Sequence, residues 1–339
     1  FKLEAALLGS LIFALTPYWF VDIYVRGSMG EVMAIAWFMI FLASVERKWD
    51  VLVSLGIAGI IVSHNILSII FVPIAICYVL LRQKRYVWNI FLGVGLSSYF
   101  WIPAVLERQY VTGLNTVNFR EHFPELFQLL IPSWGTGFST VGIPNGEMSQ
   151  QLGIMTIVVS IWTAILVVRE KERRVKGLIC GSLLLLVSVG FLMLGVSQPL
   201  WELLSPLQFL QYPWRLLSVM LPLSGLFAAY VGSKSKGNVW VLMVAVIAIA
   251  LSLRYIRPVT YEPRNDGYYL SRREFTDGTS SLGNSFSAVW SPWKQKDAKQ
   301  NPRTAARAVL RKGNTIALLH VGKHHYYKLP GGGVEEGET

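Results

Sequence analysis

Residues 178–195 read LICGSLLLLVSVGFLMLG, eighteen consecutive positions without a charged side chain. A helix needs about 20 mostly apolar residues to cross the hydrocarbon core of a bilayer, so this stretch predicts a membrane span. Further stretches of the same character stand at 3–19, 30–45, 50–64, 66–81, 87–105, 152–168, 215–232 and 238–254. The sequence therefore predicts an all-α polytopic membrane protein with about nine transmembrane helices. The stretches 50–64 and 66–81 are short, and His64-Asn65 between them could equally mark a polar break in a tilted pair.

The composition of the 339 residues agrees with a membrane protein, because 53% are hydrophobic and only 15% are charged. Soluble domains carry about 25% charged residues, which excludes an ordinary soluble enzyme over most of this length. The net charge of +11 does not indicate nucleic-acid binding, since the basic residues form short clusters between apolar runs rather than a basic face. Cys77 and Cys180 lie within apolar stretches and predict neither a disulfide framework nor a metal site. A chain that begins with Phe1 is expected to be a fragment of a longer protein.

The basic residues also predict an orientation. The loops after 30–45, 66–81, 152–168 and 215–232 hold twelve Lys and Arg, whereas the alternate loops hold four. This asymmetry is the positive-inside pattern. It predicts a multi-pass protein of the cell membrane with a cytoplasmic N-terminus and an extracytoplasmic C-terminus. Within the long outer loop, the apolar stretch 123–134 is too short to span, and it predicts either an interfacial helix or a loop that folds onto the bundle.

Ionisable and aromatic side chains gather at the outer end of the first span, where residues 17–31 read PYWFVDIYVRGSMGE. If this segment is helical, Asp22 and Arg26 stand four residues apart and can pair, and Glu31 begins the next span. Charged groups at this depth are costly unless they are paired or face a wet cavity. One interpretation is a cavity in which a carboxylate positions an acceptor or a metal and Arg26 holds a phosphate. The other is an interfacial ion pair beside an aromatic belt of Tyr18, Trp19 and Tyr24.

Two more polar motifs stand at outer helix ends. In QYPWR at 211–215, Pro213 suits the first turn of a helix, so Arg215 and free backbone N–H groups there could bind a phosphate. Alternatively, Arg215 extends to the lipid headgroups. In Ser63-His64-Asn65, a lone His is either a satisfied hydrogen-bonding group or a base.

These motifs, taken in order, resemble the bacterial membrane family named the 6-pyruvoyl-tetrahydropterin synthase-related domain. The resemblance covers residues 1–293, and the layout of that family is similar to that of GT-C membrane glycosyltransferases. It implies that a sugar is taken from a polyprenyl-phosphate carrier at the outer face of the bilayer. It also implies a substrate or phosphate site made of Asp22, Arg26, Glu31, His64, Asn65, Gln211 and Arg215. Such enzymes usually carry their catalytic carboxylate in the first outer loop, whereas Asp22 and Glu31 match a later acidic position, so the catalytic residue stays unknown.

The sequence changes character after residue 293. On this basis we expect a transmembrane domain at 1–255, an outer tail at 256–293, a polar linker at 294–302 and a β segment at 303–339. The last segment ends in LPGGGVEEGET and resembles the start of a Nudix hydrolase, with Gly332 and Glu338 at the first two positions of the Nudix box. Glu335, Glu336 and Glu338 would attract Mg²⁺ only loosely, because the helix that supplies the other glutamate ligands would follow Thr339. The resemblance thus implies an incomplete, inactive metal site.

The leading hypothesis is a GT-C-like glycosyltransferase or related envelope-glycan protein, with the lipid bilayer and a polyprenyl-phosphate-linked sugar as partners. One alternative is a transporter of lipid-linked substrates, which broken helices would favour. Another is a Nudix pyrophosphohydrolase encoded by a longer gene product.

Overall fold

The computed structural model is a bundle of helices and describes residues 2–110, 118–142, 147–235 and 238–256, together with the backbone of short strands between 305 and 333. The chain divides into two units. One comprises Phe1–Gln109 with Leu114–Pro263, and the other Tyr110–Gly113 with Arg264–Thr339.

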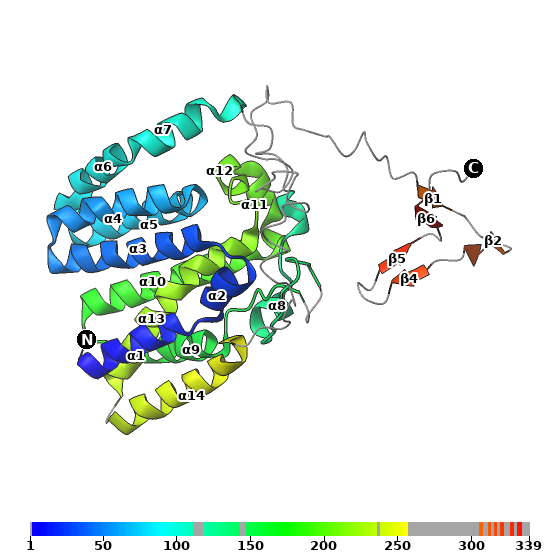
Figure 1. Ribbon diagram of the computed structural model, residues 1–339. Coiled ribbons are helices and arrows are strands. Elements are labelled where there is room, and N and C mark those ends of the chain that lie inside the picture. Colours follow the sequence, from blue (N-terminus) through cyan, green and yellow to red (C-terminus); the bar gives the residue numbers. More distant parts are fainter. Residues whose placement is uncertain are drawn as a thin grey trace, which may run out of the picture. The chain divides into compact units, whose positions relative to one another are not determined.

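The helical unit contains long helices joined by short helical turns (Figure 1). In chain order these are α1 (Leu3–Ala14), α2 (Pro17–Phe20), η1 (Val21–Val25), α3 (Met29–Arg47), α4 (Asp50–Ser63), α5 (Asn65–Arg82), η2 (Lys84–Tyr86), α6 (Val87–Leu96), α7 (Ser98–Leu106), η3 (Arg108–Tyr110), η4 (Phe119–Glu121), α8 (Leu126–Leu130), α9 (Ile154–Val168), α10 (Arg173–Met193), η5 (Gly195–Ser197), α11 (Gln198–Leu203), α12 (Ser205–Gln208), η6 (Pro213–Leu216), α13 (Leu217–Lys234) and α14 (Asn238–Ile256).

Five of the described helices are long and apolar enough to cross a membrane: Met29–Arg47, Asn65–Arg82, Arg173–Met193, Pro213–Lys234 and Val239–Ile256. Two bent pairs raise the number to seven if each is one span. Leu3–Ala14 and Pro17–Val25 meet at 44°, and Lys84–Leu96 and Ser98–Leu106 meet at 63°. The predicted spans 50–64 and 152–168 correspond to α4 and α9, which have 14 and 15 residues and are short for a bilayer about 30 Å thick. His64 and Asn65 do mark a break, because α4 ends at Ser63 and α5 begins at Asn65.

The core of the bundle is α13, which is buried over most of its length and packs against α1, α9 and α10. Helix α1 lies beside α13 (Figure 1), and their contact is close because Gly9 faces Gly225 and Ala229. A Cβ atom added at Gly9 would lie 2.6 Å from the carbonyl oxygen of Gly225. Without a hydrophobic driving force between helices in lipid, such backbone approach is a main source of packing energy in membranes.

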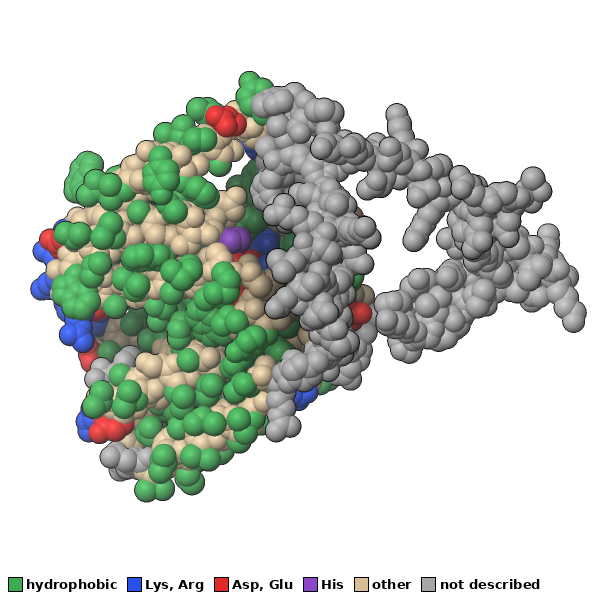
Figure 2. All heavy atoms as spheres, in the orientation of Figure 1, with side chains coloured by type: hydrophobic (Ala, Val, Ile, Leu, Met, Phe, Trp, Pro, Cys, Tyr) green, Lys and Arg blue, Asp and Glu red, His purple; other side chains and the backbone are tan. Residues whose placement is uncertain are grey.

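The face of the bundle seen in Figure 2 carries many hydrophobic side chains. Large hydrophobic side chains on α5, α6, α9, α10 and α14 are exposed, an arrangement that suits contact with lipid. Cys77 and Cys180 also lie on this outer surface as free thiols, rather than in the core.

Figure 2 shows charged side chains at the end of the bundle where, in the same orientation in Figure 1, the chain turns after α3 and α5, opposite α8 and α11. Ion pairs connect these loops and helix ends: Arg82 lies 2.8 Å from Glu46, and Lys234 lies 2.7 Å from Glu170. The long helices therefore have one strongly basic end, as the distribution of Lys and Arg along the sequence predicts.

The apolar stretch 123–134 forms only the five-residue helix α8. The carboxylate of Glu125 and the amide of Gln128 cap its first turn, and Leu129 is buried. Only Leu126–Leu130 of this stretch is helical, and the rest is a loop. Its position at the membrane interface stays a prediction.

Six short strands occur in the second unit: β1 (Ala305–Arg307), β2 (Arg311–Lys312), β3 (Thr315–Ile316), β4 (Leu319–Val321), β5 (Tyr326–Lys328) and β6 (Gly331–Gly333). They form three separate antiparallel pairs, β1 with β6, β2 with β3 and β4 with β5. Gly332 lies in β6 opposite Ala306. Glu335, Glu336 and Glu338, like the predicted segments 256–293 (beyond Ile256) and 294–302, lie outside the described residues. The Nudix-like reading of this segment stays a prediction.

Candidate functional site

The first half of the candidate site forms where the helix that begins at Leu3 breaks. Pro17 starts a new helix at a 44° bend, and η1 then widens into a π-helical turn in which the N–H of Arg26 donates to the carbonyl of Val21 over 2.9 Å. Gly27 reverses the chain with φ of +60°, and α3 begins two residues later. This path turns Asp22, Arg26 and Glu31 toward one another.

The break between α4 and α5 brings His64 to the same place. Its backbone is extended, and its Nδ1 accepts the N–H of Leu67 over 3.2 Å, so the ring caps α5. A neutral His that accepts at Nδ1 carries its proton on Nε2. Nε2 lies 3.7 Å from Oε1 of Glu31. This approach depends on Gly30, since a Cβ atom there would lie 2.7 Å from the carbonyl oxygen of Ser63.

The third contribution comes from the turn before α13. Gln211 adopts φ of +65°, Pro213 begins η6, and Arg215 turns inward. Its Nη1 donates to the carbonyl oxygen of Leu210 over 2.8 Å and to Oε1 of Gln211 over 3.1 Å. Arg215 is only 7% exposed, so the alternative in which it extends to the lipid headgroups is wrong.

Glu31 is the centre of the resulting cluster. Its Oε1 accepts from Nη2 of Arg26 over 2.6 Å and from Nε of Arg215 over 2.9 Å. Its Oε2 accepts from Nη1 of Arg26 over 2.7 Å and from the hydroxyl of Tyr18 over 3.1 Å. Asp22 also pairs with Arg26 across one helical turn. We call Tyr18, Asp22, Arg26, Glu31, His64 and Arg215 the charged cluster.

Burial makes this cluster energetically demanding. Asp22 and Glu31 are completely buried, while the side chains of Arg26 and His64 remain 13% and 17% exposed. Two carboxylates face two guanidinium groups, so the formal charges balance when His64 is neutral. A buried carboxylate requires such partners, because its desolvation costs several kcal/mol in real proteins.

The cluster retains hydrogen-bonding capacity. Nε of Arg26 and Nη2 of Arg215 have no partner among the described residues, and Oδ2 of Asp22 is buried without one in the same part of the chain. The Arg26 guanidinium also lies 4.7 Å from the ring centroid of Trp214, which restricts its movement. Chemically, the arrangement offers fixed cationic donors and an acceptor beside them. These are the groups that can hold a phosphate and a hydroxyl.

Of the residues identified from the sequence, Asp22, Arg26, Glu31, His64, Gln211 and Arg215 lie together. Asn65 does not join them, because it is exposed and its Oδ1 accepts from the neighbouring backbone N–H of Ile66. Sequence analysis assigned Tyr18 only to an aromatic belt and missed its hydrogen bond to Glu31. The i,i+4 spacing from Tyr18 to Asp22 and on to Arg26 could have placed all three on one helical face.

The structure offers little support for a metal site in the helical unit. The described residues contain no group of three or more His, Cys, Asp or Glu side chains arranged to hold a metal ion. Figure 2 shows acidic, basic and His side chains close together on the described part of the bundle.

Comparisons of the chain with protein-family models, with curated proteins and with solved structures found no match.

Proposed function

We propose that this protein is a GT-C-like membrane protein that acts on a polyprenyl-phosphate-linked sugar, with the charged cluster as the site that receives the phosphate. The observation that carries the proposal is the pair of arginines, Arg26 and Arg215, held on one carboxylate at a common end of the helices. Each guanidinium keeps a donor nitrogen without a partner among the described residues. A phosphate oxygen could accept from both.

The proposed topology places the cluster at the outer face. The basic loops after α3, α5, α9 and α13 would then be cytoplasmic, which agrees with the positive-inside rule. In this arrangement α4 and α9, although short, count as spans, and the bent pairs α1–α2 and α6–α7 count as one span each. That gives nine spans.

Glu31 has a positioning role in this proposal. It accepts three charge-assisted hydrogen bonds from the two arginines, and these bonds fix both guanidinium planes before the substrate arrives. Preorganised donors bind an anion more strongly than mobile ones, because the ordering cost is already met. We assign to Asp22, whose Oδ2 is buried without a partner in the described part of the chain, the role of accepting a hydrogen bond from a sugar hydroxyl.

The binding of polyprenyl monophosphate to the purified protein in lipid nanodiscs tests the proposal. Arg215→Lys keeps the charge but loses the fork that bonds Glu31 and Leu210 together. We expect it to weaken binding about tenfold, which corresponds to about 1.4 kcal/mol. The matched control is Arg120→Lys, because Arg120 forms an exposed ion pair with Glu202 at 2.9 Å, far from the cluster in sequence.

Equal affinity of the Arg215→Lys and Arg120→Lys proteins, both folded, would rule out the cluster as the phosphate site. If Arg215→Lys does not fold, Arg26→Lys provides the same test, because Arg26 is the second arginine that bonds Glu31. Sugar transfer is then measured with labelled polyprenyl-phosphate sugars as donors and with acceptor glycans that carry no peptide.

The bent helices favour a second candidate, transport of a lipid-linked substrate. The first span changes direction by 44° and becomes π-helical where Asp22 lies, and discontinuous helices carrying polar groups are typical of transporters. Proteoliposomes separate the two functions. A transporter moves labelled polyprenyl-phosphate sugar between leaflets without changing it, whereas a transferase releases polyprenyl phosphate.

A further inference from the structure

A second feature, separate from the charged cluster, is an apolar cavity between α9 and α14. Its volume is about 250 Å³, and its lining includes Val158, Trp162, Trp240, Val244, Ile247 and Leu251. Trp162 and Trp240 meet across it in an edge-to-face contact, with centroids 5.5 Å apart. Several lining side chains are strongly exposed, Ile247 to 50%, so the cavity opens on the outer surface of the bundle.

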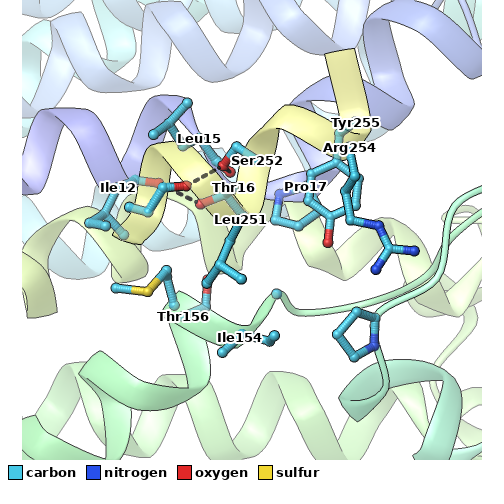
Figure 3. Close-up of a pocket in the computed structure, with 14 residues that line it drawn as sticks. Ile12, Leu15, Thr16, Pro17, Ile154, Thr156, Leu251, Ser252, Arg254 and Tyr255 are labelled. Carbon is cyan, nitrogen blue, oxygen red and sulfur yellow. Dashed lines mark hydrogen bonds between the residues drawn. The ribbon is translucent and has the colours of Figure 1, made fainter. Parts of the chain in front are cut away.

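The cavity continues toward the end of α14. A smaller cavity of about 40 Å³ shares Ile154, Met155 and Leu251 with the larger one, so the two are adjacent, and we refer to them together as the groove. Figure 3 shows this end, where Ile154 and Thr156 face the side chains of α1 and α14. The groove therefore runs along one side of α14, from Trp240 to Arg254 and Tyr255.

Polarity changes along the groove. At Trp240 the lining is apolar, whereas Thr16, Ser252 and Arg254 lie at the other end. The two hydroxyls are satisfied within the bundle: Thr16 donates to Ile12 over 2.9 Å, and Ser252 donates to Ala248 over 2.8 Å. Arg254 is exposed, and it forms no ion pair with a carboxylate of the described residues. In Figure 3 its guanidinium points away from Ile12 and Leu15.

Water does not suit such a groove, because apolar cavities of this size stay dry. An empty groove would also lose dispersion contacts on every lining side chain. A hydrocarbon chain would restore them. Arg254 lies 5.6 Å from the ring centroid of Tyr255 and has no carboxylate partner in the described part of the chain. An apolar channel that ends at such a cation matches an amphiphile with a negative head.

We propose that the groove binds one phospholipid with a net negative headgroup, its phosphate at Arg254 and one acyl chain along α14 as far as Val244. The ten residues from Val244 to Arg254 rise about 15 Å along a helix. Half of the hydrocarbon core of a bilayer is also about 15 Å thick. A lipid of one leaflet thus fits between the two positions. This proposal does not depend on the proposed function.

Native mass spectrometry of the purified, delipidated protein tests it, with phosphatidylglycerol and phosphatidylcholine as probes. The protein should retain one phosphatidylglycerol in preference to phosphatidylcholine by about fivefold, the advantage expected for one arginine near an anionic headgroup. Arg254→Gln should abolish this preference while some binding of both lipids remains.

The second experiment fills the groove with a larger side chain. Val244→Phe should reduce retention of both lipids about tenfold, because the ring occupies the space of the chain. Val246→Phe is the matched control, since Val246 is 56% exposed on the same helix and does not line the groove. Equal retention by the two Phe variants would overturn the proposal. So would an unchanged headgroup preference in Arg254→Gln, or retention of polyprenyl monophosphate in place of phosphatidylglycerol.

Discussion

Glu31 accepts a hydrogen bond of 2.9 Å from Nε of Arg215, although 184 positions separate the two residues in the sequence. The bond joins the first turn of α3 to the turn that precedes α13, the most buried helix of the bundle. Both side chains are almost fully enclosed. The contact is therefore at once a structural connection between two long helices and the centre of the candidate site.

Removing the charge of Glu31 should destabilise the protein severely. Glu31→Gln leaves Arg26 and Arg215 facing each other with only Asp22 to compensate them, and breaking a buried ion pair in this way costs about 3–5 kcal/mol. We expect a large drop in melting temperature for the detergent-solubilised protein. Glu46→Gln is the control, because Glu46 pairs with Arg82 on the surface, where such a pair contributes about 0–1 kcal/mol. Equal melting temperatures for the two variants would contradict the complete burial of Glu31.

The contact between α1 and α13 gives a second prediction. In Gly9→Ala, the new Cβ would lie 2.6 Å from the carbonyl oxygen of Gly225, so the helices must separate, at a cost of about 1–3 kcal/mol. Gly181→Ala is the control, since a Cβ there meets no atom within 4 Å. Because alanine is the better helix former by about 0.5–1 kcal/mol, the control should be neutral or stabilising. Thermal melting of both proteins in one detergent measures the difference, and a loss of stability in the control alone would refute the packing argument.

The loop between α9 and α10 predicts a dependence of stability on pH. Lys234 donates a hydrogen bond to Glu170 and, with the backbone N–H of Glu172, lowers the pKa of Glu170 to about 2. The carboxyl group of an unfolded chain titrates near pH 4.3. A group with a lowered pKa in the folded state stabilises that state above the unfolded pKa, and the stabilisation is lost as the pH falls toward 2.

The wild-type melting temperature should therefore fall between pH 5 and pH 3 by more than that of Glu170→Gln, which has no charge to lose at this position. Melting curves of both proteins at each pH measure the effect. Parallel curves for the two proteins would show that the ion pair does not contribute.

Much of the helical architecture could be predicted from apolar run length, because lipid demands long apolar helices regardless of tertiary context. The bends in the helices could not be predicted in this way. Pro17 and the polar pair His64-Asn65 signal breaks, but the π-helical turn at 21–25 depends on how the enclosed Asp22 and Arg26 are satisfied. The five-residue length of α8 likewise depends on a local cap that run length does not report.

The candidate site was predictable in membership but not in arrangement. Charged residues at outer helix ends must find partners, which is why Asp22, Glu31 and Arg215 stand out in the sequence. The bond from Arg215 to Glu31 joins residues 184 positions apart, and no local pattern encodes it. His64 and Asn65, adjacent in sequence, separate for the same reason, since only one of two neighbouring side chains can face the cluster.

The topology is testable without further structural work. Reporter fusions in the four basic loops, after Lys48, Arg85, Lys176 and Lys236, should report cytoplasm, and fusions near Thr116 and Ser197 should report the outer side. The expectation follows from the twelve-to-four distribution of Lys and Arg and from their position at one end of the bundle. A cytoplasmic signal at Ser197 would place the charged cluster on the wrong face for an outer carrier lipid.

His64 and Asn65 provide the sharpest test of the site, because they are neighbours with different surroundings. His64→Ala removes a ring that lies 3.7 Å from Glu31 and caps α5, and loss of the cap should cost about 1 kcal/mol. We expect this variant to bind polyprenyl monophosphate more weakly than wild type, since the α4–α5 break then moves relative to Glu31. Asn65→Ala leaves the cluster intact, because its side chain is exposed and bonds only the adjacent backbone. Binding to the two variants in nanodiscs, after melting curves show that both are folded, makes the comparison. Weaker binding in Asn65→Ala than in His64→Ala would mean that the functional surface lies on the outer side of α5 rather than at the charged cluster.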